Sequence, residues 1–320
     1  MKSAVKKSHI VEVSHLVKRY NKATANAVDD VSFYVEEGAF FSLLGPNGAG
    51  KTTIISILTT ILSRTRGDVT IAGFDTETAA AAVRQNIGVI FQNPSLDLNL
   101  TAEENIRFHA NLYHLFPYMP TFSFMPDRYK QNVMKLAGVV GLEKDIFKPV
   151  KALSGGMKRK LEIIRSLMHR PKVLFLDEPT TGLDPISRQN LWKYLQEIRS
   201  KEEITIFLTT HYLEEAEASD YICIIDSGKI VAQGSPTEIK EALIENYILV
   251  DTSHRPALAR ELNRLRYRFT GTGPFKIDLG KKSAQEVIKH IDTPLTTMDI
   301  HSPTLEDAYV EIITNHHERP

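Results

Sequence analysis

The chain has 320 residues, 42% of them hydrophobic and 24% charged, an ordinary composition for a folded globular protein of about two domains. Lysine plus arginine and aspartate plus glutamate each total 39, so no net charge points to nucleic acid or an anionic membrane as the partner. No apolar run reaches the roughly 18 residues of a membrane-spanning helix, and the basic first ten residues lack the apolar stretch of a signal peptide.

The first part of the chain, over residues 8–240, predicts an α/β domain. Three continuous apolar runs are typical of strands buried on both faces of a parallel sheet: 40–45, 172–179 and 204–211. A helix is predicted at 51–62, directly after the first run. Leu191, Leu195 and Ile198 share one face of a helix between the other two runs.

Two further segments, 69–75 and 221–234, combine strand-forming residues with glycine turns and are predicted as antiparallel additions to the sheet. Cys223 lies in the second of them. As the single cysteine it cannot form an internal disulfide, which fits a reduced compartment. Its apolar neighbours predict a buried strand position.

After about residue 243 the pattern changes to that of a small α+β domain, 243–320. Strands are predicted at 247–251, 274–279 and 294–300. Helices are predicted at 256–266, 283–291 and 302–313, the second opened by a capping box of Ser283 and Glu286 and the third by Pro303. Its arginines make either a basic patch or a solvated helix face, and they are Arg255, Arg260, Arg264, Arg266 and Arg268.

Residues Gly45 to Thr52, GPNGAGKT, match the phosphate-loop pattern between a predicted strand and a predicted helix. Gly48 and Gly50 let the backbone curve around an anion with its N–H groups pointing inward. Lys51 is predicted to reach the β- and γ-phosphates, and the Thr52 hydroxyl to ligate Mg²⁺. The sequence therefore predicts a nucleotide site.

The apolar run at 172–179 ends in two carboxylates. Asp177, at the end of the strand, is placed to hold Mg²⁺ beside the phosphate loop. Glu178 follows one residue later and is the candidate base that orients or deprotonates the attacking water.

A third motif, LSGGM at 153–157, opens a helix in an unexpected way. Ser154 is a good N-cap, and the buried stripe behind it is formed by Met157, Leu161, Ile164 and Met168. Two glycines in the first turn, Gly155 and Gly156, each cost about 1 kcal/mol relative to alanine in a helix. That cost calls for a functional reason.

Together these motifs resemble the nucleotide-binding domain of ABC transporters over roughly residues 8–240, with LSGGM as the family's signature motif. The resemblance implies a P-loop NTPase of ABC type, with a parallel core sheet, an antiparallel β subdomain and a helical subdomain. It also implies that ATP and Mg²⁺ bind here.

The resemblance assigns roles to further residues. Tyr20 matches the aromatic residue that stacks on adenine, with a packed strand-end residue as the alternative. Asp184 in GLDP matches the D-loop. Catalytic roles are implied for Glu178, His211 (the switch histidine) and Gln92 (the Q-loop glutamine), and metal ligands for Thr52, Gln92 and Asp177. The implied nucleotide-binding residues are Tyr20, Gly45, Pro46, Asn47, Gly48, Ala49, Gly50, Lys51, Thr52, Thr53, Ser154, Gly155, Gly156 and Asp184.

In this family the signature helix contacts a nucleotide that is bound by a second subunit. The resemblance therefore implies a reason for the two glycines. Ser154 and the bare amides of Gly155 and Gly156 face that nucleotide, and a side chain would hold the backbone away from phosphate. A second ABC ATPase subunit is therefore implied as a partner, most simply as a homodimer.

The subfamily resemblance is to ATPase subunits of exporters of the daunorubicin-resistance and nodulation-factor type, carried by 92–113, 154–163, 209–236 and 302–313. It implies an ATP-hydrolysing subunit that powers export of a drug-like, lipid or saccharide molecule. Separate transmembrane permease subunits would hold it at the cytoplasmic side of the cell membrane. The alternatives are an importer ATPase and a soluble ABC ATPase acting on a macromolecular assembly; nucleic acid is not an expected partner.

Residues 115–126, LFPYMPTFSFMP, interrupt the expected helical subdomain. Three prolines prevent a continuous helix, and four aromatic side chains are costly to leave in water. The segment either folds back onto its own subdomain or contacts a membrane subunit.

Overall fold

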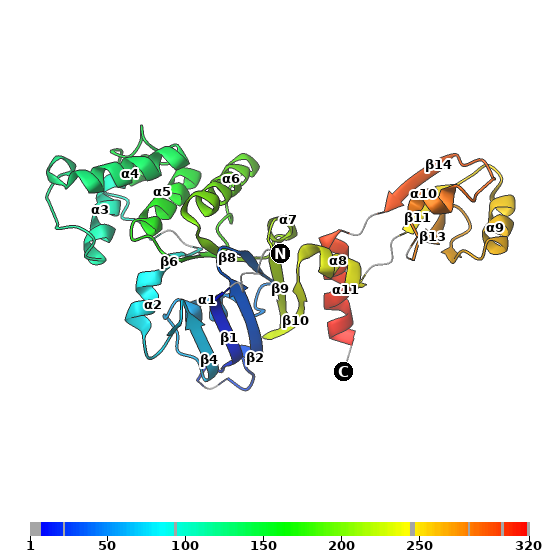
Figure 1. The fold of residues 1–320 in the computed structure, drawn as a ribbon, viewed down its shortest axis with the longest axis horizontal. Coiled ribbons are helices and arrows are strands. Elements are labelled where there is room, and N and C mark those ends of the chain that lie inside the picture. The colour runs from blue at the N-terminus through cyan, green and yellow to red at the C-terminus, as the bar shows by residue number, and fades with distance from the viewer. Residues whose placement is uncertain are drawn as a thin grey trace, which may run out of the picture. The chain divides into compact units, whose positions relative to one another are not determined.

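The computed structural model describes residues 8–21, 23–92, 95–243, 247–280, 282–301 and 304–318. They form two compact units, Met1–Gln233 and Gly234–Pro320 (Figure 1). The domain boundaries at residues 240 and 243 stay a prediction from the sequence. None of the helices in the described ranges combines the length and apolar character that crossing a membrane requires.

A six-stranded sheet forms the centre of the first unit. Its strand order is β10-β9-β3-β8-β7-β6. The strands are β3 (Phe40–Leu44), β6 (Ile87–Ile90), β7 (Val173–Asp177), β8 (Thr205–Thr210), β9 (Tyr221–Asp226) and β10 (Lys229–Gly234). Every residue of β3, β7 and β8 is buried, and these strands pair in parallel. The three predicted strands and the parallel core are confirmed.

One predicted strand direction is wrong. β9 was expected to be an antiparallel addition, but it pairs in parallel with β3, with Phe41 opposite Tyr221 and Leu44 opposite Ile224. α7 (Leu213–Glu217) makes the crossover from β8. A strand buried on both faces, as β9 is, has the continuous apolar pattern of a parallel sheet, and the following glycine turn belongs only to its junction with β10.

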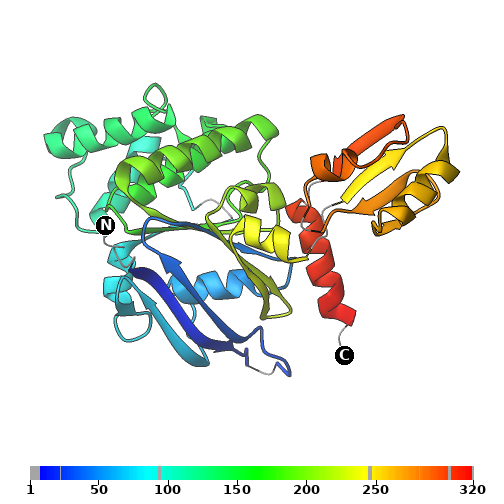
Figure 2. The same ribbon diagram turned by 45° about the vertical axis from the view of Figure 1, so that its right-hand side comes forward.

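A second, antiparallel sheet has the order β2-β1-β4-β5. Its strands are β1 (His9–Lys18), β2 (Val28–Glu36), β4 (Arg66–Ile71) and β5 (Phe74–Asp75). Helix α1 (Lys51–Leu58) shares one buried cluster with this sheet and with the central sheet, and Figure 2 shows it between the two. Because α1 starts at Lys51, this packing fixes the phosphate loop at the edge of the core.

Helices form the rest of the first unit. They are α2 (Ala80–Asn86), α3 (Ala102–Leu112), α4 (Asp127–Val140), α5 (Gly155–Leu167) and α6 (Pro185–Glu202), with single 3₁₀ turns at Phe122–Phe124 and Val150–Ala152. Thr101 and Glu104 form a capping box at the start of α3, and Ser154 and Asp184 cap α5 and α6.

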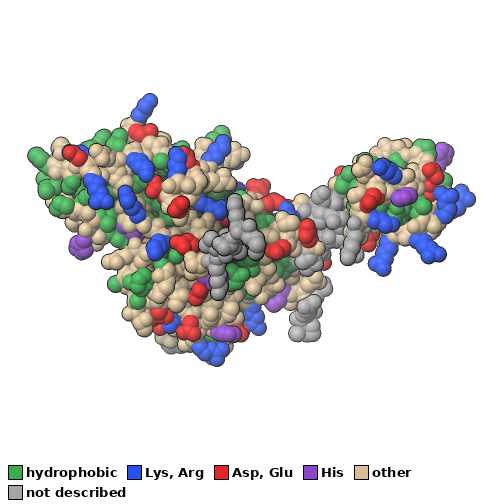
Figure 3. Space-filling view, in the orientation of Figure 1, with side chains coloured by type: hydrophobic (Ala, Val, Ile, Leu, Met, Phe, Trp, Pro, Cys, Tyr) green, Lys and Arg blue, Asp and Glu red, His purple; other side chains and the backbone are tan. Residues whose placement is uncertain are grey.

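The 115–126 segment divides between burial and exposure. Phe122 packs edge-on against Tyr129 and Phe147, with ring centroids 6.1 and 5.1 Å apart, and so folds back onto its own subdomain. Phe124 remains 69% exposed and Tyr118 50% exposed. Hydrophobic side chains gather at the left-hand edge of this subdomain, around α3 and α4 (Figure 3).

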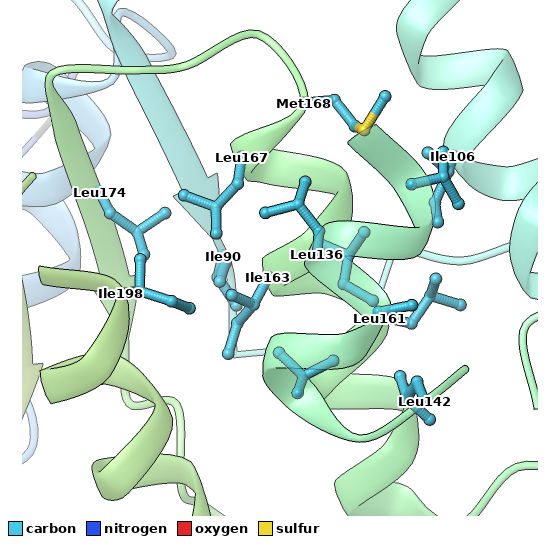
Figure 4. Close-up of a cluster of buried hydrophobic side chains, with 14 of the residues drawn as sticks. Ile90, Ile106, Leu136, Leu142, Leu161, Ile163, Leu167, Met168, Leu174 and Ile198 are labelled. Carbon is cyan, nitrogen blue, oxygen red and sulfur yellow. The ribbon is translucent and has the colours of Figure 1, made fainter. Parts of the chain in front are cut away.

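Helix α5 is buried on two sides. Ile163 and Leu167 face Ile90 of β6 and Leu174 of β7, while Leu161 lies on the side of α3 and α4 (Figure 4). The side chains of Leu161, Ile163, Ile164 and Leu167 are all at most 5% exposed. The helix that begins with the signature motif is thus wedged between the central sheet and the helical subdomain.

The second unit is α+β, as predicted. Its elements are α8 (Pro236–Leu243), β11 (Tyr247–Asp251), α9 (Arg255–Arg264), β12 (Phe269–Thr270), β13 (Phe275–Asp278), α10 (Ala284–Ile288), β14 (Thr297–His301) and α11 (Leu305–Glu318). The sheet order is β12-β13-β11-β14, and every pairing is antiparallel. The Ser283–Glu286 capping box is present, whereas Pro303 lies outside the described residues. The short strand β12 had not been predicted.

Candidate nucleotide site

The phosphate loop connects β3 to α1 with a strongly curved backbone. Gly48 and Gly50 have φ values of 83° and 108°, which residues other than glycine rarely adopt. A Cβ at Gly50 would also lie 2.7 Å from Ala27 O, so the loop passes too close to the preceding segment for any other residue. Gly228 N, in the turn between β9 and β10, donates to Ala49 O at 3.0 Å and holds the loop from behind.

Lys51 lies under this loop and is only 5% exposed. Its Nζ donates to Gly45 O at 2.7 Å and Pro46 O at 3.0 Å, and lies 3.6 Å from Glu178 Oε1. Burial lowers the pKa of Lys51, and the neighbouring Glu178 charge acts in the opposite direction. The ammonium group is therefore in place beside the loop whose N–H groups would receive phosphate.

Glu178 is the meeting point of the predicted catalytic residues. Gln92 Nε2 donates to its Oε2 at 3.1 Å, and His211 Nδ1 lies 3.2 Å from its Oε1. The residue has a φ of 44°, unusual for a side chain of this size. Its own N–H donates to Thr209 O at 3.1 Å, which fixes the turn beyond β7. Segments far apart in the sequence thus converge on one carboxylate.

The carboxylate of Asp177, one residue earlier, has a different hydrogen-bond partner from that of Glu178. Its side chain is 5% exposed, and its Oδ1 accepts a 2.5 Å hydrogen bond from Thr209 Oγ1. Burial raises the pKa of Asp177. Thr209 stands opposite Asp177 in the pairing of β7 with β8, and sequence reasoning missed it because a threonine in a buried strand carries no motif.

The residues also fit a hard metal ion. Thr52, Gln92 and Asp177 supply hydroxyl, amide and carboxylate oxygens, and the buried Asp177 has its second oxygen to offer. Mg²⁺ is usually held by one or two protein side chains together with substrate phosphates. The described residues contain no cluster of three or more His, Cys, Asp or Glu side chains that could hold a metal ion.

A cavity of about 480 Å³ opens over the phosphate loop. Its lining residues are Ala27, Asn47, Gly48, Gly50, Lys51, Thr52, Thr53, Gln92, Glu178, Thr181, His211 and Tyr212. Tyr20 does not line it but is near: its Oη lies 3.2 Å from Thr53 Oγ1, and its side chain is 45% exposed. The ring lies beside the loop, with Lys18 Nζ 5.5 Å from its centroid, and its stacking on a base stays a prediction.

The signature residues do not line this cavity. Ser154 Oγ accepts from Met157 N at 3.3 Å, and Asp184 caps α6 by accepting from Ser187 N at 3.0 Å. Hydrogen bonds from Ser187 lower the pKa of Asp184. Ser154 and Gly155 are both exposed.

Gly156 has a second explanation inside its own chain. A Cβ there would lie 3.1 Å from Ser187 Oγ and 3.3 Å from Ser187 Cβ, whereas a Cβ at Gly155 would meet nothing closer than 4.0 Å. Gly156 is therefore packed tightly against Ser187 between α5 and α6, so that a side chain there would push Ser187 by a few tenths of an ångström, which the sequence did not indicate.

The chain is similar in sequence to several known proteins. A family model described as ABC transporter matches residues 28–181. Nod factor export ATP-binding protein I of Ralstonia nicotianae is 40% identical over 231 residues, covering 72% of this chain and 68% of that protein. Doxorubicin resistance ATP-binding protein DrrA of Mycobacterium tuberculosis is 40% identical, with 72% and 67% covered. Probable multidrug ABC transporter ATP-binding protein YbhF of Escherichia coli is 34% identical, but the match spans 38% of its length.

Solved structures give the same result. The chain resembles the ATP-binding subunit of an ABC transporter at 29% identity, with a TM-score of 0.63 over 73% of this chain and 92% of the other. It resembles cbiO1 of Clostridium perfringens, part of the ABC transporter complex cbiONQ, at 25% identity with a TM-score of 0.65, covering 81% and 97%. Members of the family bind and hydrolyse ATP. This chain belongs to the family of ABC transporter ATP-binding proteins.

Proposed function

We propose that the chain is the ATP-binding and ATP-hydrolysing subunit of a membrane transporter. The observation that carries the proposal is the convergence of Gln92, His211 and Lys51 on the Glu178 carboxylate, at 3.1, 3.2 and 3.6 Å, in a cavity lined by the phosphate loop. A site that only bound nucleotide would not need a carboxylate held among three polar partners.

Each residue has a proposed task. The phosphate-loop N–H groups and Lys51 hold the β- and γ-phosphates of ATP, and Tyr20 stacks on its adenine. Glu178 accepts a proton from the attacking water, while Gln92 and His211 orient the water and the γ-phosphate. Thr52, Gln92 and Asp177 are the proposed ligands of Mg²⁺, which neutralises phosphate charge when bound.

The proposed active form is a dimer. Ser154, Gly155 and Gly156 lie outside the chain's own nucleotide cavity, and Ser154 and Gly155 are exposed. A helix N-terminus with bare amides favours phosphate, so a second subunit is the proposed owner of the nucleotide that they contact. A homodimer is the simplest arrangement that completes both sites.

The proposed direction is export, powered together with separate transmembrane permease subunits at the cytoplasmic side of the membrane. The named relatives act in Nod factor export and doxorubicin resistance, which supports a drug-like, lipid or saccharide cargo. An importer subunit is the alternative, since its catalytic motifs would be the same.

The experiment is in two parts. Purified chain should hydrolyse ATP with magnesium and lose that activity when EDTA removes the metal; no hydrolysis under either condition would contradict the enzyme assignment. Co-expression with a candidate transmembrane permease subunit should then give a complex. In inside-out vesicles, ATP-dependent accumulation of a lipophilic drug or a labelled oligosaccharide supports export, whereas ATP-dependent release of preloaded cargo supports import.

A further inference from the structure

Arg159, in the second turn of α5, is a buried cation that the catalytic motifs do not include. Its side chain is only 5% exposed. Nε donates to Pro179 O at 2.8 Å, and Nη1 donates to Phe91 O at 2.5 Å. Nη2 lies 3.5 Å from Asp177 O, at the limit of a hydrogen bond. One guanidinium group thus joins the signature helix to two other segments of the chain.

The carbonyls that Arg159 binds flank the two residues at the centre of the site. Asp177 O and Pro179 O lie on either side of Glu178, and Phe91 O immediately precedes Gln92. Gln92 and Glu178 are themselves joined at 3.1 Å. Because each residue is anchored through its neighbour's backbone, the geometry of that pair depends on where Arg159 stands.

Glu162, one turn further along α5, completes the anchorage. Its side chain is 1% exposed and pairs with Arg159 Nη1 at 2.9 Å. The other oxygen, Oε1, accepts from Ser95 N at 3.0 Å, beyond Gln92. The segment that carries Gln92 is therefore tied to α5 on both sides, at Phe91 and at Ser95.

A guanidinium group suits this position because it has five N–H donors in a fixed plane. Lysine would keep the positive charge next to Glu162, but its single ammonium group cannot reach carbonyls on two different segments in that plane. Removing the charge altogether would leave the buried Glu162 with only the more distant Arg165, whose Nη2 lies 4.0 Å from its Oε1, and this is destabilising.

We propose that Arg159 is a positioning residue that sets the Gln92–Glu178 geometry for hydrolysis from the signature helix. The inference rests on the proposed ATPase function. Since the N-terminus of α5 is the part that would contact the partner's nucleotide, Arg159 gives that contact a direct mechanical route to the chain's own hydrolytic pair.

The test compares turnover, ATP binding and backbone protection in the full chain. Arg159→Lys should lower kcat at least about tenfold, because displacing reacting groups by an ångström is enough to cost about a hundredfold. Its affinity for a fluorescent ATP analogue should stay within about threefold, because the phosphate loop is untouched. In a Glu178→Gln background the same change should have almost no further effect on residual turnover, because the pair that it positions is already inactive.

Arg199→Lys is the matched control. Arg199 also binds a backbone carbonyl, Gly38 O at 2.8 Å, and a carboxylate, Asp220, but it lies outside the nucleotide cavity. It should retain near wild-type turnover. An equal loss in Arg199→Lys, or equal losses from Arg159→Lys with and without Glu178, would overturn the positioning role, as would unchanged kcat in Arg159→Lys.

A second variant and a second readout keep the test decisive if Arg159→Lys unfolds or if the wild-type chain does not hydrolyse ATP. Arg159→Gln with Glu162→Gln removes both members of the buried pair together, so Glu162 is not left as a buried charge without Arg159 if Arg159→Lys proves unstable. Arg165, whose Nη2 lies 4.0 Å from Glu162 Oε1, keeps its charge in this variant. Hydrogen exchange should increase in segments 87–100 and 173–182 in both variants, with no change in the strands of the second unit. Unchanged exchange in those two segments would overturn the proposal. If the wild-type chain fails to hydrolyse ATP, the proposed function fails, while hydrogen exchange still decides the anchorage.

Discussion

Gly156 and Ser187 are in van der Waals contact range across the α5–α6 junction, so close that a methyl group at residue 156 would lie 3.1 Å from the serine hydroxyl. A methyl group at the neighbouring Gly155 would meet only Leu183 Cδ2, at an ordinary contact distance of 4.0 Å. The two glycines of the signature motif therefore differ in what a side chain would disturb. At Gly156 it would press on Ser187 inside the chain, and at Gly155 it would obstruct the proposed close approach of a partner from outside.

This difference predicts opposite outcomes for two matched substitutions. Gly155→Ala should keep or raise the melting temperature, because alanine is favoured over glycine by about 1 kcal/mol in a helix, yet it should impair ATP-driven dimerisation and turnover. Gly156→Ala should also impair dimerisation and turnover, but unlike Gly155→Ala it should lower the melting temperature, because Ser187 must move to make room for the methyl group. Differential scanning fluorimetry and ATPase assays on both proteins check this. Equal melting temperatures would contradict the packing role of Gly156.

Replacing Glu178 by glutamine should leave ATP binding intact and nearly abolish hydrolysis. General-base catalysis is worth about 10²–10⁴ in rate, and glutamine keeps the shape while losing the basicity. The variant should accumulate as an ATP-bound dimer on a sizing column with magnesium present. Turnover close to wild type would remove Glu178 from the proposed role.

Tyr20→Ala should weaken ATP binding more than it slows turnover at saturating ATP. Stacking of a base on an aromatic ring is worth about 1–3 kcal/mol, here used by analogy with nucleic-acid complexes. Tyr20→Phe is the matched control: it keeps the ring but loses the 3.2 Å contact with Thr53. Titration with a fluorescent ATP analogue measures the affinities. If both variants bind like wild type, the ring does not stack on the base.

Phe122 and Phe124 form a natural pair for testing the 115–126 segment. Phe122→Ser should lower the melting temperature, since its ring packs against Tyr129 and Phe147. Phe124→Ser should leave melting temperature and basal ATPase unchanged, because that ring is 69% exposed. If the exposed ring contacts a membrane subunit, Phe124→Ser will reduce co-purification with that subunit. Full retention of the complex would rule out this contact.

His109 predicts a loss of stability in acid. Burial, together with the charge of Arg165 and the neighbouring His169, lowers the pKa of His109 from its ordinary 6.5 to about 3. The unfolded chain therefore binds an extra proton between these values, so stability is complete above about pH 6.5 and falls toward pH 3, by up to about 1.4 kcal/mol per pH unit.

His109→Phe keeps a ring at this site but cannot titrate. The drop in melting temperature between about pH 7.5 and pH 5.5 should be smaller than in wild type. A wild-type pH dependence in His109→Phe would show that other groups dominate acid unfolding.

Much of the site could be predicted because its residues follow local patterns. The phosphate loop, Asp177, Glu178 and the capped signature helix each combine a motif with a strand or helix boundary. Gln92, His211 and Tyr20 depended on the resemblance to a family, because a single glutamine, histidine or tyrosine has no physical signature of its own.

What the sequence could not predict depends on tertiary contacts. Thr209 acquires its role only because β8 pairs with β7 in register, and Arg159 only because two segments far apart in the sequence present carbonyls to it. The predicted direction of β9 is wrong for a related reason. The glycine turn after β9 indicates an antiparallel hairpin, but it applies only to the junction with β10, whereas the apolar run of β9 itself reflects burial on both faces. The two-residue strand β12 is too short to leave a pattern.

The turn between β9 and β10 has a consequence for how the protein folds. Gly228 donates to Ala49 O in the phosphate loop, and its own carbonyl accepts from Asp29 N at 2.8 Å, so it ties together segments about 180 residues apart in the chain. During synthesis, residues 45–52 leave the ribosome long before residue 228 exists. The nucleotide site can be completed only after this late, non-local contact forms, and contacts between distant parts of a chain form slowly. Until then the phosphate loop of the unfinished chain lacks its hydrogen bond to Gly228. A nascent chain stalled before β9 should therefore fail to retain ATP, even though every residue of the phosphate loop has already been made.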